Sequence, residues 1–519
     1  MTSLAFGRGR HWLGRPSVLP WKLGRWLRLQ RASRAYRSAL AGGDASLLVE
    51  AGPLPAAGLI SVVMPVFRVA ERHLRAAIAS VRAQSWPHWE LLIVDDASPD
   101  PHVARVLAEA AADPRVHVTR RSANGGISAA SDDGVAAARG EYVAFLDHDD
   151  ALHPRALELV TRFLAAHPDT DWLYTDEDKI DGRGRHADPI LKPGWSRHLL
   201  LGCNVASHLR VVRRGAIARA GGHRRGLEGA QDYDLALRVL ATGGRFAHLP
   251  GPLYHWRTVP RSMARVAGAK PDANARALAA LAEYARTFPR GGAVTAEVIA
   301  PGASLFRVRR APDPALRLAV AAPAGTALEL PAGSPVALVS PAAASPAALV
   351  AAARGCHADV LAVAPPGGFG AGQLEELLSL LQVPGTAAAG GQLVAGRRIA
   401  ASGWELDGGG APLDRWRGLH VSDPGEGNFA LLPSRRLALP PSGWAAWRAE
   451  AVAAWDAAAE VPEPWRLAAG WHRLGLEVVT TPDARFPVHG AGPWPPAGTP
   501  PRDLLQTLAS PLALAGRVP

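Results

Sequence analysis

Short apolar runs and amphipathic stretches alternate in a regular order through the front of this chain. Mainly apolar runs of four to seven residues predict buried strands, and longer stretches with apolar positions three or four apart predict helices. We expect strands at 60–66, 90–95, 116–119 and 142–146, with helices at 71–84, 101–112 and 127–138 between them. Strands that alternate with helices of this length form a parallel sheet with crossover helices, so the expected fold class is α/β.

Polar residues stand where two of these strands end. Asp95 and Asp96 close the second strand, and Asp147, His148 and Asp149 follow the fourth. Ligands of such sheets bind at the carboxyl ends of the strands. A functional site is therefore expected at this edge.

The chain is too long for one compact domain, because it has 519 residues. A change of pattern near residue 53 and an Ala-, Pro- and Gly-rich composition beyond residue 290 suggest four parts. We expect a basic N-terminal segment at 1–57, a first α/β domain at 58–290, a second domain at 291–490 and a Pro-rich tail at 491–519. The second domain keeps strand-like runs, such as 359–363, but no acidic cluster follows them.

The net charge of +11 comes from one end of the chain. Residues 1–43 hold nine of the 57 Arg and Lys residues and no acid, and the remainder is near neutral. This distribution argues against nucleic acid as a partner and favours local contact with an anionic surface, such as the inner leaflet of a membrane. The basic residues from Lys22 to Arg37 recur every third position and wrap around a helix, so a helix docked on the protein itself, or a disordered leader, stays open as an alternative.

The cysteine content and the hydropathy of the sequence indicate the cellular compartment of the protein. The two cysteines, Cys203 and Cys356, lie far apart in the sequence, which fits a reducing cytosol. No apolar run is long enough to cross a bilayer, and the N-terminus lacks the pattern of a signal peptide. We expect a cytoplasmic protein with peripheral contact to the inner face of the cytoplasmic membrane through residues 1–43.

The Asp-x-Asp pattern at 147–149 suits a divalent metal. Two carboxylates at alternate positions after a strand can face one space, and oxygen ligands suit Mg²⁺ or Mn²⁺ carrying a diphosphate. His255 is a candidate to complete the metal shell, and Arg257 to hold phosphate oxygens. A solvated turn is the alternative for the acids, and a buried hydrogen-bonded histidine is the alternative for His255.

Two further segments suit a nucleotide. A carboxylate of Asp95 or Asp96 could accept hydrogen bonds from a base or ribose, although helix capping is the alternative. Asn124 and Gly125, with Gly126, precede a helix whose N-terminus favours phosphate or ribose oxygens. An ordinary turn is the alternative for this second segment.

Proton transfer is assigned to another part of the sequence. Asp232 stands at the start of the helical stretch that follows Gln231, and it is a candidate general base for an acceptor hydroxyl. A first-turn acid favoured by the helix dipole is the alternative, and Asp234 is expected to be structural. An apolar run is followed by three acids, Asp176, Glu177 and Asp178. These acids are expected either to line a sugar or acceptor pocket together with Gln231, or to form a solvated acidic loop.

Eight motifs in order resemble a known family. They are Ser61–Phe67, Leu92–Ser98, Asn124–Ser128, Phe145–Asp150, Tyr174–Asp181, Lys192–Ser196, Gly229–Leu235 and Leu253–Arg257. The first four are similar to those of the inverting family 2 glycosyltransferases, which have the GT-A fold. The others are similar to the bacterial branch that builds O-antigen, capsule and related surface glycans.

The resemblance implies a role for individual residues. The base and ribose of a nucleoside-diphosphate sugar would be framed by Pro65, Val66, Asp95 and Asp96. The ribose and the diphosphate-bound metal would be held by Asp147 and Asp149. Asp232 would be the catalytic base. The chain lacks the Q-x-x-R-W motif and membrane helices of the processive synthases at the expected place. The resemblance therefore implies a non-processive transfer of one or a few sugars to a glycan or lipid-linked glycan.

The back half resembles the later part of a second such domain only faintly. Leu374–Leu377, Gly390–Leu393 and Arg398–Gly403 carry this likeness, while the place of the Asp-x-Asp motif reads Ala364-Pro365-Pro366. We therefore expect a degenerate, GT-A-like accessory domain without a metal site, which acts in scaffolding or acceptor binding.

Two other functions compete with glycosyl transfer. Nucleotidyl transfer would need a glycine-rich loop after the first strand, which Pro65–Arg68 lacks. A non-catalytic nucleotide-sugar-binding scaffold would not need the intact Asp147, Asp149 and Asp232.

Overall fold

The structure is a computed structural model of the chain, and it describes residues 52–258 without a gap. Before this stretch it describes positions 34, 36–38 and 48. After it, the described residues are 271–288, 292–300, 304–322, 326, 328–330, 336–339, 358–364, 368–370, 372–401, 405–406, 412–413, 434–436, 444–447 and 477–487. Most of the expected basic segment and the whole expected Pro-rich tail lie outside the described residues.

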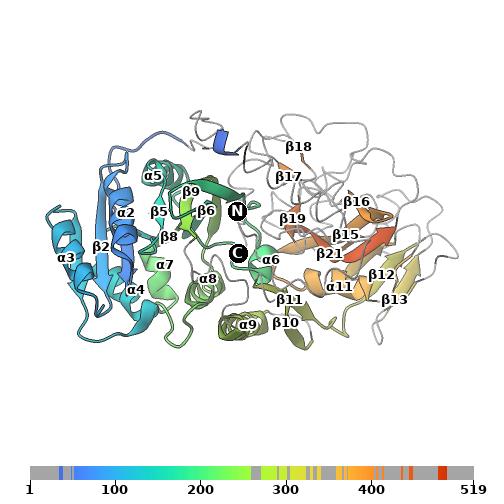
Figure 1. Ribbon diagram of the computed structural model, residues 1–519. Coiled ribbons are helices and arrows are strands. Elements are labelled where there is room, and N and C mark those ends of the chain that lie inside the picture. Colours follow the sequence, from blue (N-terminus) through green and yellow to red (C-terminus); the bar gives the residue numbers. More distant parts are fainter. Residues whose placement is uncertain are drawn as a thin grey trace, which may run out of the picture. The chain divides into compact units, whose positions relative to one another are not determined.

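The chain divides into two compact units, which are described one at a time (Figure 1). Unit 1 comprises Met1–Lys192, Asn204–Ala280 and Ala300–Ser304. Unit 2 comprises Pro193–Cys203, Leu281–Ile299 and Leu305–Pro519. Among the helices of the described residues, none combines the length and the apolar character that a bilayer span requires.

Unit 1 contains the alternating strands and helices that the apolar pattern predicts. In chain order its elements are β1 (Ile60–Val66), α2 (Glu71–Arg82), β2 (Trp89–Asp95), α3 (Pro101–Ala110), β3 (Val116–Arg120), α4 (Gly126–Ala137), β4 (Tyr142–Phe145), β5 (Ala151–Leu152), α5 (Ala156–Ala166), β6 (Trp172–Ile180), β7 (His186–Ile190), β8 (Arg210–Arg213), α7 (Arg214–Arg219), α8 (Gln231–Ala241) and β9 (Phe246–Arg257). The helix α9 (Pro271–Arg286) has residues in both units.

Local sequence explains where the crossover helices form. In α2 the buried residues include Leu74, Ala77, Ile78 and Val81, and their spacing of three and four places them on one helix face. Pro101 is the first residue of α3, where a missing N–H costs no helical hydrogen bond. Helix α4 packs on β1 and β2, and α2 packs on α3 and β5, beside the parallel strands (Figure 1).

The sheet of unit 1 has the order β3-β2-β1-β4-β8-β6-β9-β5, with β7 added at β6. The pairs β1–β2, β2–β3, β1–β4 and β6–β9 are parallel, and β8 is antiparallel to both β4 and β6. Six strands therefore run in one direction, and only β5, β7 and β8 oppose them. The expected mostly parallel α/β sheet is confirmed.

The core of unit 1 lies between this sheet and its helices. Met64, Leu74, Leu91 and Trp89 are among the largest side chains that are fully buried. Burial of one such side chain contributes roughly 1.5–3 kcal/mol relative to exposure. The packed core fixes the strand ends, and through them the polar residues that follow.

One of the two alternatives considered for Asp176, Glu177 and Asp178 is contradicted by the structure. The segment Thr175–Lys179 is not a solvated acidic loop, because β6 continues through it to Ile180 and pairs with β7 and β9. Asp176, Glu177 and Asp178 are all buried. Their charges are compensated by histidines and a lysine, which are described below.

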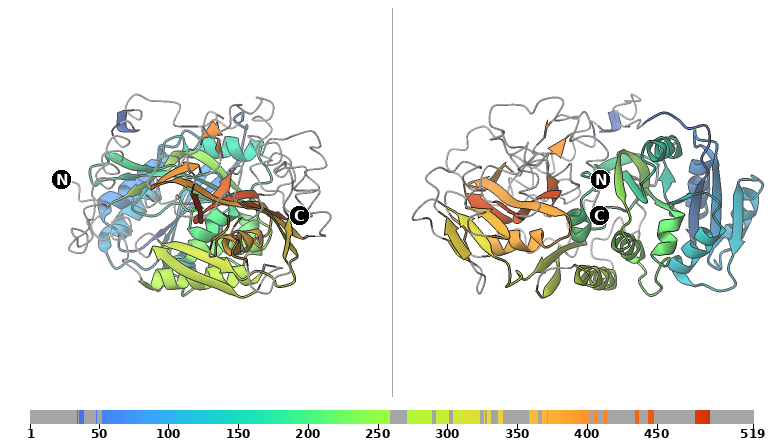
Figure 2. Two further views of the ribbon diagram at one scale, coloured as in Figure 1. Left: turned by 90° about the vertical axis from the view of Figure 1, so that its right-hand side faces the viewer. Right: turned by 180° about the vertical axis from the view of Figure 1, so that it is seen from behind.

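Unit 2 is built around a second mixed sheet. Its elements are α6 (Arg197–Gly202), β10 (Val294–Ala300), β11 (Leu305–Arg310), β12 (Leu318–Ala321), β13 (Val336–Val339), β14 (Val360–Val363), α11 (Gln373–Leu381), β15 (Thr386–Ala395), β16 (Arg398–Ala401), β17 (Glu405–Leu406), β18 (Pro412–Leu413), β19 (Ser434–Arg436), β20 (Trp444–Trp447) and β21 (Glu477–Pro487). Strand β10 ends on Ala300, which belongs to unit 1. Helix α11 packs on β15, β20 and β21 (Figure 2).

The two sheets share a strand order. In unit 2 the strands follow the order β13-β12-β14-β20-β15-β21. The pairs β13–β12, β12–β14 and β15–β21 are parallel, and β20 is antiparallel to both of its neighbours, β14 and β15. The path β2-β1-β4-β8-β6-β9 of unit 1 has the same sequence of directions. The chain also visits the corresponding strands in the same order in both units.

Candidate active site

Four strands of unit 1 bring polar residues to one edge of the sheet. Strands β1, β2 and β4 end there at Val66, Asp95 and Phe145. Strand β8 runs the opposite way, so its first residue, Arg210, lies at that same edge. The segment before β8 therefore lies at the same edge of the sheet as the segments after the other three strands.

Asp96 holds the glycine loop. Its carboxylate accepts hydrogen bonds from the backbone N–H of Gly125 at 2.9 Å and of Gly126 at 2.8 Å, and from Arg121 at 2.7 Å. The amide of Asn124 donates to the backbone carbonyl of Asp96 at 3.2 Å. Gly126 has a φ of +82°, which suits glycine. Asp96 thus fixes the loop that begins α4.

Asp95 and the end of β1 are also engaged with the protein. The Asp95 carboxylate accepts from the backbone N–H of Ser98 at 2.9 Å and lies 3.5 Å from Arg120. The carbonyl of Pro65 lies 3.1 Å from Nδ1 of His148, and the carbonyl of Val66 accepts from the N–H of Asp96 at 2.9 Å. The backbone of β1 therefore joins the two acidic segments.

The acids from Asp147 to Asp150 have different surroundings. The Asp147 side chain is 37% exposed, whereas Asp150 is buried. Asp150 accepts from the hydroxyl of Tyr254 at 2.6 Å and from the backbone N–H of Arg257 at 2.7 Å. Burial raises the pKa of Asp149, the nearby His148 lowers it, and Asp147 raises it further. Asp150, which the sequence left without a role, anchors this segment to β9.

The side chain of Arg257 also holds the Asp147–Asp150 segment in place. Its Nε donates to the backbone carbonyl of Asp149 at 2.6 Å, and its side chain is nearly buried. Burial lowers the pKa of Arg257, while Asp150 and Asp149 raise it. The structure therefore brings Arg257 to the Asp147–Asp150 segment through backbone contacts.

His208 is a site residue that sequence reasoning missed. Its Nδ1 lies 2.8 Å from the Glu177 carboxylate, and its Nε2 lies 3.9 Å from the Asp147 carboxylate. The ring stacks on Tyr254 with a centroid distance of 4.6 Å. Burial lowers the pKa of His208, but Glu177 and then Asp147 and Asp150 outweigh it, so the pKa is raised. A histidine in a loop carries no sequence signal for this placement.

Asp232 lies in the first turn of α8, as expected, and is held by Asn204, from the segment before β8, and by Arg210, the first residue of β8. Its Oδ2 accepts from the amide of Asn204 at 2.9 Å and lies 3.6 Å from Arg210. The Arg210 guanidinium lies over the ring of Phe145, 4.5 Å from its centroid. Asn204 Oδ1 and Arg210 Nε are buried without a protein hydrogen-bond partner among the described residues. Neither residue was singled out from the sequence.

The neighbours of Asp232 have structural contacts. Gln231 is buried, and its side-chain oxygen accepts from the N–H of Gly229 at 2.6 Å. Asp234 is fully buried and pairs with Arg224 and with Arg238, the latter at 2.7 Å. Asp234 therefore has the structural surroundings that its helical position suggested.

The three acids of β6 are each compensated by a different partner. Asp176 lies 2.8 Å from His248 and accepts from the backbone N–H of Gly251 and Lys192, both at 2.8 Å. Glu177 contacts His208, and Lys192 lies 3.9 Å from it. Burial raises the pKa of Glu177, but Lys192 and His208 lower it to about 2.

The structure places His255 with Asp178 instead of with Asp147 and Asp149. Its Nδ1 lies 2.7 Å from the Asp178 carboxylate. Neighbouring residues of a strand point to opposite faces of a sheet. Tyr254 points toward Asp150 and His208, so His255 points the other way.

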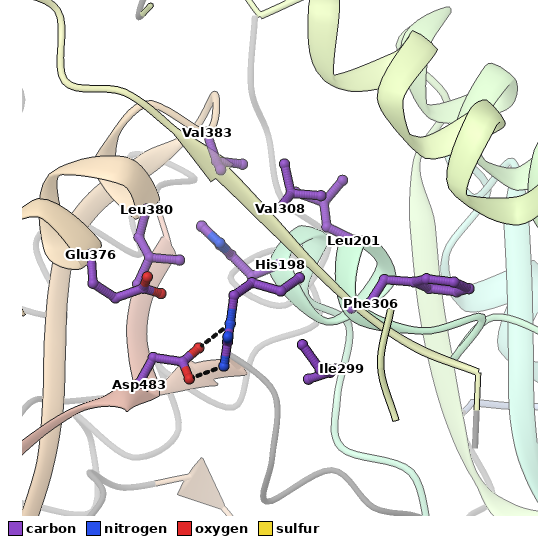
Figure 3. A pocket seen from close by; sticks show the side chains of 11 residues that line it. His198, Leu201, Ile299, Phe306, Val308, Glu376, Leu380, Val383 and Asp483 are labelled. Atoms are coloured by element: carbon purple, nitrogen blue, oxygen red, sulfur yellow. Dashed lines mark hydrogen bonds and ion pairs between the residues drawn. The ribbon is translucent and has the colours of Figure 1, made fainter. Parts of the chain in front are cut away.

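Unit 2 has a pocket of its own (Figure 3). It is lined mainly by apolar residues and by the side chains of His198, Arg307, Glu376 and Asp483. Asp483 is paired with Arg307, and Glu376 accepts from Arg309 at 3.0 Å. The acids of this pocket are therefore compensated by arginines, unlike Asp147 and Asp149 in unit 1.

The sequence comparisons agree with the site of unit 1. The family described as Glycosyl transferase family 2 matches residues 61–216, which contain β1 to β4 and the Asp147–Asp150 segment. EpsE of Bacillus subtilis, a protein named as a glycosyltransferase, is 30% identical over 207 residues, which are 38% of this chain and 72% of EpsE. The chain belongs to glycosyltransferase family 2. The family indicated by the motifs is confirmed, as is the GT-A-like α/β fold of the first unit.

Other relatives of this family 2 member are longer proteins. The O-antigen biosynthesis protein RfbC of Myxococcus xanthus is 40% identical over 252 residues, which are 48% of this chain and 20% of RfbC. The chain spans 28% and 20% of the length of two of its curated relatives. A solved structure of TarS from S. aureus in complex with UDP-GlcNAc matches with a TM-score of 0.37 and 19% identity, over 44% of this chain and 66% of that one.

Proposed function

We propose that unit 1 transfers a sugar from a nucleoside-diphosphate donor to a hydroxyl of a surface-glycan acceptor, with inversion at the anomeric carbon. One observation carries this proposal. His208 lies 3.9 Å from Asp147 and Arg210 lies 3.6 Å from Asp232, and these two residues are separated only by Leu209. The stretch from His208 to Arg210, at the start of β8, thus links the candidate donor end of the site to the candidate base.

The residues at the donor end fit a divalent metal. Asp147 and Asp149 offer oxygen ligands, and the crowding of their charges contributes to the raised pKa of Asp149. A bound cation would relieve that repulsion. When present, Mn²⁺ or Mg²⁺ would neutralise negative charge that grows on the departing diphosphate.

The remaining roles belong to the chain itself. Asp96 keeps the loop of Asn124 and Gly125 at the start of α4, where backbone N–H groups favour oxygen atoms of the nucleotide. Pro65 and Val66 with Asp95 border the same space from β1 and β2. A base and ribose in this region would agree with the roles that the resemblance implies.

Asp232 is proposed to take the proton of the acceptor. The hydroxyl oxygen bonds to the anomeric carbon as the bond from that carbon to the diphosphate oxygen breaks, and the hydroxyl proton passes to Asp232. The nucleoside diphosphate leaves with the bonding electron pair. Asn204 and Arg210 orient the carboxylate for this step.

The acceptor class follows from the relatives. RfbC is named for O-antigen biosynthesis, so a glycan or lipid-linked glycan is proposed as the acceptor. Transfer of one or a few sugars is proposed because the processive-synthase motif is missing from the sequence. Contact of residues 1–43 with anionic lipid, and a cytoplasmic location, remain predictions of the sequence.

A donor panel tests the proposal. The purified chain is incubated with sugar donors carrying UDP, GDP or dTDP, with and without Mn²⁺, and the released nucleoside diphosphate is measured. We expect release with one donor class to require Mn²⁺, and Asp149→Asn and Asp232→Asn to lower it by roughly 10²- to 10⁴-fold. Asp169→Asn, an exposed acid paired with Arg245, is the control and should be unaffected. Full turnover in both site variants would contradict the mechanism.

The competing function is a non-catalytic nucleotide-sugar-binding scaffold. It predicts saturable donor binding without release of nucleoside diphosphate from any member of the panel. The intact acids at 147, 149 and 232 favour the enzyme.

A further inference from the structure

A second group of metal-binding side chains lies in unit 1, on strands β6, β7 and β9. Asp178, His186 and His255 each offer one ligand atom, and these atoms all lie within 4.8 Å of one another. We propose that these three residues bind a divalent transition-metal ion, zinc above all, at a site separate from the acids at 147–149. This proposal does not rest on the proposed function.

The site lies on the face of the strands away from the candidate active site. Along β9, Tyr254 contacts Asp150 and His208, while the next residue, His255, contacts Asp178. Along β6, Glu177 contacts His208, while Asp178 contacts His255. Because side chains alternate across a strand, one member of each pair faces the active site and the other faces the new group.

The distances between the ligand atoms of Asp178, His186 and His255 are close to those expected around a bound zinc ion. Nδ1 of His255 and Nδ1 of His186 each lie 2.7 Å from a different oxygen of Asp178. Ligand atoms at about 2.0–2.1 Å from tetrahedral zinc lie roughly 3.3 Å apart. A shift of about half an ångström would therefore exchange two N–H···O hydrogen bonds for bonds to the ion, as these zinc ligand distances imply.

Further partners orient the ligands. The Tyr36 hydroxyl donates to Asp178 at 2.6 Å, and Tyr36 is buried. The ring of His153 lies 6.0 Å from that of His255. An outer hydrogen bond such as that from Tyr36 fixes the orientation of a metal ligand.

The ligand set selects the class of ion. Two imidazoles and one carboxylate suit zinc and its neighbours in the transition series, whereas Mg²⁺ and Ca²⁺ prefer oxygen ligands throughout. His186 is partly exposed, with 32% of its side chain accessible, so an ion has a route to the site. The other two ligands are buried. A bound ion would join β6, β7 and β9 directly, and Tyr36 through its hydrogen bond to Asp178.

The test measures zinc on the whole chain. The protein is stripped with a chelator, loaded with zinc, dialysed, and its zinc content is measured by mass spectrometry. Titration with Co²⁺ then reports coordination through its visible absorption. We expect one tightly held equivalent of zinc, and a Co²⁺ spectrum typical of nitrogen and oxygen ligands. His186→Gln should lower zinc affinity at least tenfold, because loss of an outer partner alone costs that much.

Two variants sharpen the result. His117→Gln is the matched control, because His117 is a partly exposed strand histidine 3.9 Å from the buried acid Glu90 but belongs to no such group of three. It should keep full zinc binding. Asp178→Asn should abolish binding while far-ultraviolet circular dichroism verifies its fold. Zinc content clearly below one equivalent in the unaltered chain, or equal loss in His186→Gln and His117→Gln, would overturn the proposal.

Discussion

The acidic residues of the site fall into two groups. In one group the carboxylates are buried and hydrogen-bonded to backbone N–H groups of distant segments, and in the other group the carboxylates are at least partly exposed at the site. Asp96 and Asp150 are buried and accept backbone N–H groups, so they shape loops. Asp147 is partly exposed and Asp232 is half-buried. The sequence identified all four as carboxylates at strand or helix ends. It could not divide them, because the partners that make the difference come from distant positions such as Tyr254 and Asn204.

Arg210 gives a test at the scale of one residue. Arg210→Lys keeps the positive charge but loses the planar group that lies over Phe145 and near Asp232. We expect the kcat of sugar transfer to fall by roughly tenfold to a hundredfold, because small displacements of a catalytic group have effects of this size. The donor KM should change little. Arg219→Lys, at an exposed arginine paired with Asp171, is the control. An unchanged kcat in Arg210→Lys would contradict the positioning role.

Asp150 gives a second test, which concerns stability. Asp150→Ala leaves the N–H of Arg257 and the hydroxyl of Tyr254 without their acceptor in a buried place. We expect the free energy of unfolding to fall by about 1–3 kcal/mol for each unsatisfied group. Urea titration followed by circular dichroism measures it. Asp169→Ala should stay within about 0.5 kcal/mol of the unaltered protein, and a similarly small effect for Asp150→Ala would show that Asp150 is not an anchor.

At the scale of elements, apolar patterning located the strands β1 to β4 and the helices between them. It failed at β6, where three consecutive acids looked like a loop. Each acid is instead buried beside a compensating base, including His248, Lys192 and His255. Strand propensity does not report such pairs, because the partners lie on β9 or in the segment before α6. The group of Asp178, His186 and His255 on β6, β7 and β9, which we propose binds a metal ion, was missed for the same reason.

Helix α5 supplies a prediction for pH. The carboxylate of Glu158 accepts from Arg155 and Ser85, and its Arg155 hydrogen bond is the main cause that lowers its pKa to about 2. A depressed carboxylate pKa adds stability above its unfolded value near 4.5, and this stability is lost as pH falls toward 2. We expect Glu158→Gln to lower the free energy of unfolding by about 1–2 kcal/mol at pH 7, after allowance for solvent screening.

The difference between Glu158→Gln and the unaltered protein should shrink between pH 4.5 and pH 2. Urea titrations at four pH values across this window measure it. Glu109→Gln is the control, because Glu109 is an exposed acid paired with Arg75. A difference that stays constant with pH would mean that the Glu158 charge is not the source of the stability.

At the scale of the whole molecule, the shared strand order of the two sheets was only faintly visible in the sequence. The strands of unit 2 are short and rich in alanine, and their side chains carry little periodic signal. The sequence did show that unit 2 has no acids at the place of the Asp-x-Asp motif. The residues after β14, which corresponds to β4, are Ala364-Pro365-Pro366 in place of Leu146-Asp147-His148. The two sheets thus share a topology although the residues after the corresponding strands differ, because a sheet needs only apolar strands of adequate length.

This contrast predicts how many nucleotide sites the chain has. The repeated strand order alone would allow two, one at the carboxyl edge of each sheet. In unit 2, however, the residues at the place of the Asp-x-Asp motif, directly after β14, are Ala364-Pro365-Pro366. The counterpart of the Asp-x-Asp motif is therefore without an aspartate. We therefore expect one equivalent of nucleoside diphosphate per chain in the presence of Mn²⁺.

Isothermal titration calorimetry with UDP, GDP and dTDP measures this stoichiometry. Because all binding should occur in unit 1, Asp149→Asn should remove the Mn²⁺-dependent heat completely, whereas Asp483→Asn, at the paired acid of the unit 2 pocket, should leave the stoichiometry at one. A second equivalent that survives in Asp149→Asn would mean that unit 2 binds nucleotide by residues other than aspartates. In that case the shared strand order would mark two working sites, and unit 2 would not be a degenerate copy.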